Sequence, residues 1–439
     1  MRVMKFGGTS VGKPDRMHQV SQLITSIAEP TIVVLSALSG TTNALVEISQ
    51  SLAVQNKKAA GEKIETLEKY YAQFIAELYQ DETLKNKASD IIKEHFEFLK
   101  ITQRISLSDA LNKDILAQGE LMSTKLFSIY LEQEKIEHAL LPALDFMCLD
   151  SNDEPDLINI QAKIKGVLAQ HASKTLFITQ GYICRNAKGE VDNLKRGGSD
   201  YTASLIAAAV KASVCEIWTD IDGMHNNDPR VVDKTVAIEQ LSFDEAAELA
   251  YFGAKILHPT CIWPAQQENI PVKLLNTMQP SAPGTVIKKE AGSVGVKAVA
   301  AKDGIIAIKI KSSRMLLAYG FLRKIFEVFD KYKTPIDMVT TSEVAVSVSI
   351  DSDLHLDEII SELNNIASIE LQKNQTIVSI VGNEIAQTDA VLQKLFACIN
   401  EIPVTMVSYG GSHHNISLLI PSEYKTKTLQ LVNKGLFNL

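Results

Sequence analysis

A lysine stands directly before a pair of glycines near the start of the chain, in the run Lys5-Phe6-Gly7-Gly8. The two glycines give backbone N–H groups room to approach an anion, and the ammonium group of a lysine at a strand end can face the same point. These residue types in this order favour an anion site, although a tight turn with an exposed lysine would explain the stretch taken alone.

The same run falls one residue short of a nucleotide-binding P-loop. Gly7 to Lys13 fit that pattern, but Pro14 follows where a Ser or Thr would hold Mg²⁺. Proline also lacks the N–H group that would donate to a phosphate. Pro14 instead suits the first turn of a helix, whose N-terminal dipole would add to the anion site. The sequence therefore predicts a phosphate site that is not a P-loop.

Polar and basic residues also follow other predicted strands. The run from Ser36 to Asn43 is dense in hydroxyl groups, and Arg196 precedes the run Gly197-Gly198-Ser199-Asp200. The planar guanidinium group of arginine can donate two parallel hydrogen bonds to a carboxylate or phosphate. Ser199 or Asp200 would cap the helix that follows. Capping alone would also explain the hydroxyl groups after Ser36.

A further basic residue, Lys255, follows Gly253 shortly before a break at Pro259. The run Thr219-Asp220-Ile221-Asp222-Gly223 reads as a strand end and turn, for which an Asx turn is a sufficient explanation. Three separate Gly/Lys/Arg clusters at strand–helix junctions are nevertheless hard to explain as independent turns. Together they predict a cleft that binds a polyphosphate.

One acidic residue, Glu120, lies in the run Gln118-Gly119-Glu120-Leu121-Met122. We expect a helix to start there, and carboxylates are stabilised at helix starts in any case. Pairing with the ammonium group of a substrate is the functional alternative, and spacing alone favours capping.

Over the first 290 residues, β-rich runs alternate with amphipathic helices, and these elements must position the candidate site residues. The alternation predicts a mostly parallel α/β sheet. Apolar spacing from 57 to 105 is helical and indicates an inserted packing or dimerisation element. The expected strands are Arg2–Phe6, Thr31–Ser36, Glu137–Leu141, Leu176–Gln180, Glu216–Thr219 and Val272–Leu275.

A boundary rich in Pro, Gly and Ser lies between Met278 and Val294, and an internal βαββαβ repeat follows it. The first copy spans 304–374. The second, 375–439, lacks its last strand, so we expect the orphan strand Val296–Ala301 to complete it, which inserts the first copy within the second. A regulatory tail is the favoured interpretation, with structural dimerisation as the alternative.

Composition limits the possible partners. The 439-residue chain carries a net charge of −8 and has no dense Lys/Arg stripe, which argues against nucleic acid or a membrane surface as partner. No apolar run approaches the roughly 20 residues of a membrane span, and the N-terminus lacks a signal-peptide core, so we expect a cytoplasmic protein. The five scattered cysteines read as buried thiols, and the histidines lack metal-ligand spacing.

In order along the chain, the motifs KFGGTSV, LSALSGTTN, QGELMS, RGGSDYTA, WTDIDG, DPRVV and FGAKILHP resemble those of the aspartate kinases. TPIDMVTTSE resembles the ACT modules of the lysine-sensitive, single-function branch. The resemblance implies an amino-acid kinase fold over 1–290, a first ACT (ferredoxin-like) module over 304–374 and a second formed by 294–303 with 375–439. It also implies transfer of the ATP γ-phosphoryl group to the β-carboxylate of L-aspartate.

The resemblance assigns roles residue by residue. Lys5 would neutralise the transferring phosphoryl group and Asp200 would organise the centre, with Mg²⁺ held mainly through the phosphates. The substrate-binding positions are Ser36, Thr42, Glu120, Arg196 and Ser199, with Glu120 at the α-ammonium group and Arg196 at a carboxylate. The ATP-binding positions are Lys5, Gly7, Gly8, Thr219, Asp220, His225, Arg230 and Lys255, where His225 replaces a frequent tyrosine.

For a lysine effector, the resemblance selects a set of positions in the first ACT module, where Asp337 and Glu343 provide acids for an ammonium group. These positions are Met315, Gly320, Phe321, Leu322, Ile336, Asp337, Thr341, Ser342 and Glu343. Leu317 and Ala318 stand where the family has His or Ser. A homodimer through the ACT sheets is the smallest assembly expected.

Two other functions remain as alternatives. The first is another amino-acid kinase, acting on glutamate or a carbamate, which the ACT tail and the Arg196 motif disfavour. The second is a non-catalytic amino-acid sensor, against which the intact Lys5, Asp200 and Lys255 argue.

Overall fold

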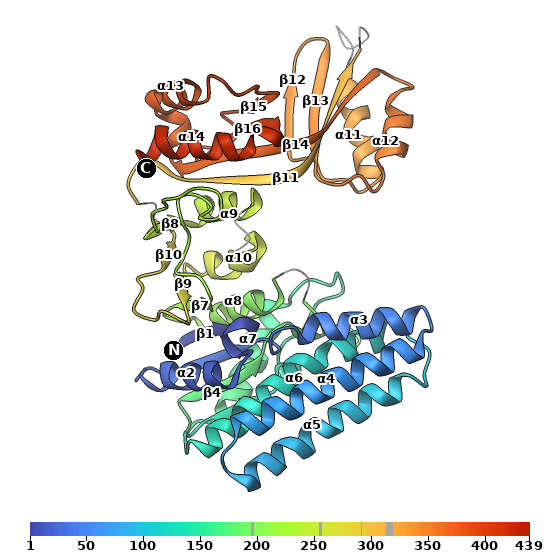
Figure 1. Ribbon diagram of the computed structural model, residues 1–439, viewed down its shortest axis with the longest axis vertical. Helices are drawn as coiled ribbons and strands as arrows, with labels where there is room; N and C mark the ends of the chain where they lie inside the picture. Colours follow the sequence, from blue (N-terminus) through green and yellow to red (C-terminus); the bar gives the residue numbers. More distant parts are fainter. Residues whose placement is uncertain (195–196, 254–256, 291, 313–318) are drawn as a thin grey trace. The chain divides into compact units, whose positions relative to one another are not determined.

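The computed structural model describes the chain except residues 195–196, 254–256, 291 and 313–318 (Figure 1). The described residues divide into two units. Unit 1 contains Met1–Met224 and Leu257–Lys289, and unit 2 contains His225–Ile256 and Glu290–Leu439. In this division residues 225–256 group with the C-terminal part of the chain, although the sequence analysis places them in the first domain.

Unit 1 is built on a mostly parallel sheet with strand order β3-β4-β2-β1-β7-β9-β10. β10 runs antiparallel to β9 and the other pairs are parallel, as the sequence predicts. Strands buried on both faces need mostly apolar runs, and β2 is buried at every position, whereas β1 keeps Arg2 and Lys5 partly exposed. The strands are β1 (Arg2–Phe6), β2 (Thr31–Leu35), β3 (Ala139–Leu141), β4 (Leu176–Gln180), β7 (Cys215–Thr219), β9 (Val272–Asn276) and β10 (Thr285–Lys288).

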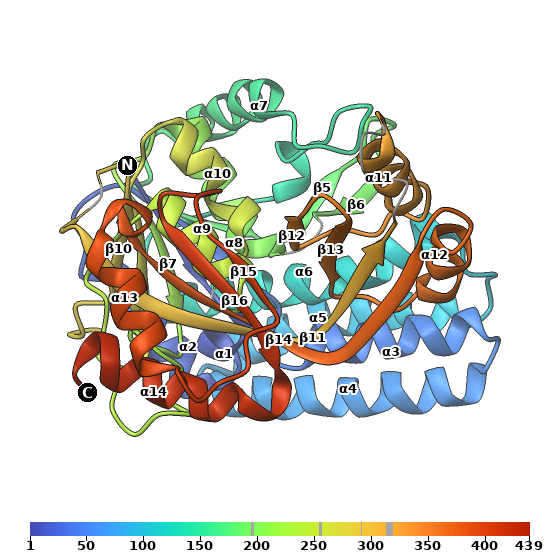
Figure 2. The same ribbon diagram turned by 90° about the horizontal axis from the view of Figure 1, so that it is seen from above.

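Helices flank this sheet in unit 1. The expected helical insertion is confirmed as α4 and α5, which lie beside α3 and α6 (Figure 2). Its buried face includes Tyr71 and Phe96, whose rings meet edge to face at 5.7 Å. The helices are α2 (Pro14–Thr25), α3 (Thr41–Ala53), α4 (Lys57–Leu78), α5 (Glu82–Thr102), α6 (Asp109–Gln133), α7 (Leu157–Ala169), α8 (Gly198–Val210) and α10 (Pro259–Gln267).

Several short elements of unit 1 lie between these. The glycine run after β1 is itself helical, because α1 (Gly8–Val11) begins at its second glycine. Pro14 is the first residue of α2, as expected, and Lys13 is its N-cap. The others are η1 (Ala143–Asp145), β5 (Ile183–Arg185) and β6 (Val191–Asn193), of which the two strands form a hairpin.

Unit 2 contains a sheet with strand order β12-β13-β11-β14-β16-β15. Separate apolar clusters lie under α11 and α12 and under α13 and α14. The strands are β8 (Gln240–Ser242), β11 (Gly295–Lys311), β12 (Met338–Thr341), β13 (Ala345–Ile350), β14 (Ser368–Asn383), β15 (Met406–Ser408) and β16 (Asn415–Pro421). The helices are α9 (Phe243–Tyr251), α11 (Phe321–Lys331), α12 (Leu356–Leu363), η3 (Ile385–Gln387), α13 (Asp389–Cys398), η4 (Ser422–Tyr424) and α14 (Lys425–Phe437).

The orphan strand Val296–Ala301 does not end before the first copy of the repeat. It continues to Lys311 as one strand, β11, because the ladder passes the Asp303-Gly304 pair with shifts in register instead of turning. Residues 296–302 of β11 pair with 377–382 of β14, which pair with β16 on the other side. Residues 305–311 lie between β13 and the first part of β14.

None of the helices in the described part of the chain is long and apolar enough to cross a membrane. Of the cysteines, Cys148, Cys184, Cys215 and Cys261 are buried and Cys398 is partly buried, all as free thiols.

Candidate active site

Lys5 and Asp200 meet at the carboxyl end of β1. Lys5 is the fourth residue of that strand and Asp200 lies in the first turn of α8. Lys5 Nζ is 2.6 Å from Asp200 Oδ1, with the two side chains 11% and 17% exposed. A Cβ on Gly7 would lie 3.4 Å from Lys5 Nζ, so this glycine leaves the ammonium group open on that side. The structure thus brings together the two residues that the sequence assigns to catalysis.

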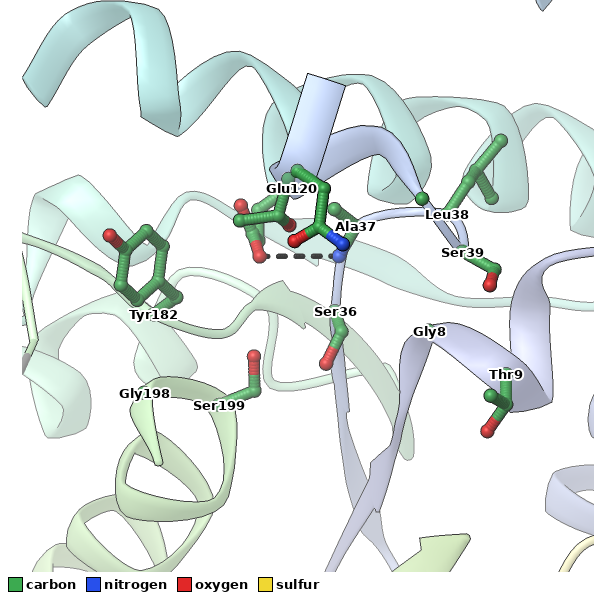
Figure 3. A pocket seen from close by; sticks show the side chains of 13 residues that line it. Gly8, Thr9, Ser36, Ala37, Leu38, Ser39, Glu120, Tyr182, Gly198 and Ser199 are labelled. Carbon is green, nitrogen blue, oxygen red and sulfur yellow. Dashed lines mark hydrogen bonds between the residues drawn. The ribbon is translucent and has the colours of Figure 1, made fainter. Parts of the chain in front are cut away.

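A cavity of about 400 Å³ is lined by Gly8, which follows the end of β1, and by Ser199, the residue before Asp200 (Figure 3). Its walls come from the β1–α1 junction, the β2–α3 loop, α6, the residues after β4 and the start of α8. Five predicted site residues contribute to it, namely Gly8, Ser36, Thr42, Glu120 and Ser199. The other lining residues are Thr9, Ala37, Leu38, Ser39, Gly40, Asn43, Tyr182 and Gly198.

Glu120 lies in the middle of α6 and is only 3% exposed, so the expectation of a helix start was wrong. That helix begins eleven positions earlier, at Asp109, where Ser108 is the cap. The backbone N–H of Ala37 donates to Glu120 Oε1 at 3.2 Å. Its Oε2 has no hydrogen-bond partner among the described residues. Burial raises the pKa of Glu120 to about 8. The cavity therefore contains a carboxyl group whose ionised form has no cationic partner among the described residues.

The β2–α3 loop is held against Glu120 by two close glycine contacts. A Cβ on Gly8 would lie 3.0 Å from the Ala37 carbonyl oxygen, and a Cβ on Gly119 would lie 2.8 Å from Ala37 Cβ. Only glycine therefore lets α1 and α6 approach the loop this closely. The loop in turn positions the Ala37 N–H group that binds Glu120.

We expect Gly119→Ala to displace this loop, since its new methyl group meets Ala37. The variant should lose about 1–3 kcal/mol of unfolding free energy and bind the substrate of the cavity more weakly. Gly166→Ala is the matched control, because Gly166 is also inside a helix and has nothing within 4 Å of a built Cβ. It should stabilise by about 0.5–1 kcal/mol. Chemical denaturation of both variants checks this, and equal stabilities would contradict it.

The start of α8 also differs from expectation. Its N-cap is Gly197, in the left-handed region with φ of +75°, and no side chain caps it, so capping by Ser199 or Asp200 was wrong. Both residues lie inside the first turn, because a left-handed N-cap shifts the start of the helix toward the glycines. Neither side chain is used as a helix cap, so both can take part in the site. The helix dipole stabilises the Asp200 carboxylate in this first turn.

Tyr182 was missed by the sequence analysis. It follows Gly181 just beyond β4, at the same sheet edge as Lys5 and Ser36, which is the signal that could have identified it. Its φ of +66° is unusual for a side chain of this size. Tyr182 N donates to Thr202 Oγ1 at 2.9 Å, and its carbonyl oxygen accepts from Leu194 N at 2.7 Å. Burial, aided by the Glu120 charge, raises its pKa to about 12, so the phenol is neutral.

The predicted nucleotide residues are distributed over both units. Thr219 and Asp220 end β7 in unit 1, where Thr219 Oγ1 donates to Asp220 Oδ1 at 3.2 Å. His225 and Arg230 belong to unit 2. Arg196 and Lys255 lie outside the described residues. The assignment of a nucleotide to these positions stays a prediction.

The predicted effector positions lie around α11 and β12 in unit 2. Asp337 is already engaged: its Oδ1 accepts from Lys302 Nζ and from Tyr251 Oη, both at 2.7 Å, and its side chain is 2% exposed. Ser342 and Glu343 are exposed, as is Leu322. Phe321 is buried, Gly320 and Thr341 are exposed, and Ile336 is partly buried. Met315, Leu317 and Ala318 lie outside the described residues.

Fold and site together define an amino-acid kinase. The amino acid kinase family model matches residues 1–276, and an ACT domain model matches 378–436. Lysine-sensitive aspartokinase 3 of Escherichia coli K12 is 31% identical over 449 residues, which cover 99% of each chain. The chain therefore belongs to the aspartokinase family of ATP-dependent kinases.

Two solved structures of E. coli aspartokinase III share the fold. The complex with aspartate and ADP, in the R-state, has a TM-score of 0.85 at 30% identity and matches all of both chains. The complex with lysine and aspartate, in the T-state, has a TM-score of 0.81 at 31% identity, over all of this chain and 99% of the other.

Proposed function

We propose that the chain transfers the γ-phosphoryl group of ATP to the β-carboxylate of L-aspartate, giving 4-phospho-L-aspartate, the first step toward lysine, threonine and methionine. The observation that carries this proposal is the buried Glu120, whose Oε2 has no partner among the described residues, in a cavity that Ser199, the neighbour of Asp200, also lines. The complex of an aspartokinase with aspartate and ADP supports the choice of both substrates.

The chemical step needs charge neutralisation more than a base. A β-carboxylate is already an anion at neutral pH, so it can attack the γ-phosphorus directly. One carboxylate oxygen forms the new P–O bond, the bond between the γ-phosphorus and the β,γ-bridging oxygen breaks, and ADP leaves with that electron pair. The main barrier is repulsion between two anions, which a fixed cation and backbone N–H groups lower. Lys5 supplies the cation, and Asp200 holds its ammonium group in place.

Recognition of aspartate follows from the cavity walls. Glu120 would pair with the α-ammonium group through Oε2, because a buried carboxylate is best stabilised by a cation in contact with it. Ser36, Thr42 and Ser199 present hydroxyl groups to the carboxylates. By resemblance, Arg196 would bind a carboxylate of the substrate through its planar guanidinium group.

For the nucleotide, the proposal assigns Gly7, Gly8, Thr219, Asp220, His225, Arg230 and Lys255. Mg²⁺ would arrive with the phosphates and neutralise their charge. The metal would be held mainly through those phosphates, and no group of three or more potential ligands that could hold a metal ion occurs among the described residues.

The proposal also includes regulation by L-lysine and a homodimer formed through the ACT modules. It places the protein in the cytoplasm. The aspartokinase III complex with lysine supports the effector. In this chain, an effector ammonium group at Asp337 would have to share the carboxylate with Lys302 and Tyr251, whereas the Glu343 side chain is exposed.

The test is ATP turnover with aspartate, with glutamate and without an acceptor, trapping the acyl phosphate with hydroxylamine and adding lysine or threonine in parallel. We expect hydroxamate only with aspartate. Hydroxamate with glutamate alone would favour another amino-acid kinase, and no turnover with any acceptor would favour a non-catalytic sensor.

A further inference from the structure

The segment 225–236 of unit 2 has no helix or strand, yet it carries His225 and Arg230, two of the residues proposed for the nucleotide. An irregular segment needs side-chain hydrogen bonds to fix its backbone. Asn226 and Asn227 supply them, and each is 3% exposed. Both reach the C-terminal helix α14 of the second ACT module.

Asn433, 4% exposed on α14, is the residue they meet. Its Oδ1 accepts from Asn226 Nδ2 and from Asn227 Nδ2, each at 3.2 Å. Its Nδ2 donates to the Lys234 carbonyl oxygen at 3.0 Å. One amide of α14 thus binds the segment near both of its ends. Buried amides with this many partners fix a single arrangement, since any other leaves polar groups unsatisfied.

The hydrogen bonds continue from Asn433 to Arg230, one of the two proposed nucleotide residues in this segment. Asn227 Oδ1 accepts from Asp228 N at 2.9 Å. Asp228 then binds Arg230 through both carboxylate oxygens, with Nε at 2.9 Å and Nη2 at 2.8 Å. The Arg230 side chain is nevertheless 85% exposed, so the guanidinium group is oriented but accessible.

The other candidate nucleotide residue is positioned at the opposite side of the segment. His225 Nδ1 lies 2.7 Å from Thr235 Oγ1, next to the Lys234 carbonyl that Asn433 binds. The carbonyl oxygen of Asn226 accepts from Val299 N in β11, and Asn226 Oδ1 accepts from Val236 N. Val232 packs into the apolar cluster of the second ACT module.

From these contacts we infer that Asn433 is a positioning residue for the nucleotide: α14 of the regulatory region holds segment 225–236 in the conformation that presents His225 and Arg230. This inference rests on the proposed assignment of those two residues to ATP. Its consequence is that nucleotide affinity depends on an amide near the C-terminus, whereas aspartate, bound by unit 1, does not.

The experiment compares Asn433→Ala with the wild-type protein by steady-state kinetics and by calorimetric titration with ADP. We expect the KM for ATP and the ADP dissociation constant to rise about tenfold, since three hydrogen bonds to the segment are lost. The KM for aspartate should stay within about twofold, a split that general loss of structure would not produce. An unchanged ATP KM in a folded Asn433→Ala protein would overturn the inference.

Two further variants separate positioning from stability. Lys434→Ala, on an exposed position of the same helix, should leave the ATP KM unchanged. Asn227→Ala should raise the ATP KM as Asn433→Ala does, and the double variant should be little worse than either, because both changes break the same contact. Fully additive effects would overturn the inference.

Leu395→Ala is a control for general damage, because it disturbs the core of the same module away from the asparagines. A raised ATP KM in this variant would also overturn the inference. Absence of aspartate-dependent turnover in the wild-type protein would instead refute the proposed function.

Discussion

Replacing Lys5 by methionine is expected to lower kcat by about 10²- to 10³-fold, the typical loss when one fixed group that stabilises developing charge is removed. Methionine keeps most of the side-chain volume and removes only the ammonium group, so the strand should still pack. The KM for aspartate should change much less, because Glu120 and the hydroxyl groups of the cavity remain. Single-turnover measurement of acyl phosphate formation would check the loss in the chemical step.

Lys13→Met is the matched control for this variant. Lys13 occupies the lysine position of the incomplete P-loop pattern, but it is exposed at the N-cap of α2. Turnover should be nearly unchanged. Slow turnover in Lys13→Met together with normal turnover in Lys5→Met would reverse the assignment. The double variant Lys5→Met/Asp200→Asn shows whether an unpaired Asp200 adds to the loss.

Glu120→Gln is expected to raise the KM for aspartate by about 100-fold, because it removes one partner of a buried charge pair while keeping the shape of the side chain. The kcat at saturating aspartate should fall less, since Glu120 lies away from the transferring phosphoryl group in the proposed mechanism. Asp114→Asn, on the same helix but outside the cavity lining, should leave the aspartate KM within about twofold. Equal effects of the two substitutions would contradict the role of Glu120.

The pKa of Glu120 adds a pH dependence to the same prediction. In the free protein burial raises it to about 8 from 4.5, so at pH 7 the group is mostly protonated and must release a proton to bind an ammonium group. The KM for aspartate should therefore fall as the pH rises from about 6 to 8. Calorimetry in buffers of different ionisation enthalpy would detect the released proton, which Glu120→Gln should abolish.

Stability of the free protein should fall over the same pH range in which aspartate binding becomes tighter. Between pH 4.5 and about 8 the folded state binds more protons at Glu120 than the unfolded state does, so the free energy of unfolding falls as the pH rises through this window. Glu120→Gln should flatten that slope in the absence of aspartate. Urea denaturation at several pH values checks this, and an unchanged slope would exclude Glu120 as its source.

Much of the site was predictable because its residues follow strands of one parallel sheet. Lys5, Ser36 and Thr219 are recognisable from local pattern, and parallel topology places their strand ends on one edge. Glu120 was expected at a helix start, but it lies in the middle of α6, directly after Gly119. Gly119 allows a close approach of α6 to Ala37, a tertiary contact that no local pattern encodes. Tyr182 was missed for a similar reason, since its role depends on a backbone conformation fixed by Thr202 and Leu194.

In the second half of the chain, the order of elements was predictable and their continuity was not. Asp303-Gly304 and Asn374 resemble turn residues, and both Gly304 and Asn374 do have positive φ. In the structure they lie within β11 and β14, which continue past them with a shifted register. A residue with positive φ can end a strand or only interrupt its hydrogen-bond ladder. The outcome depends on the strands that pair with it on each side, and the residues of those strands are distant in the sequence.

The continuity of β11 and β14 means that the two ACT modules share one pair of strands, each strand contributing to both apolar clusters. Separating these strands would expose both clusters at once, so the modules should open together as one cooperative unit and exchange their core amide hydrogens with a common protection energy. A chain shortened from the C-terminus to residue 375 would lose half of β14 and leave the first half of β11 without its partner. We therefore expect the two modules to fold after transplantation only when they are moved together as a single piece.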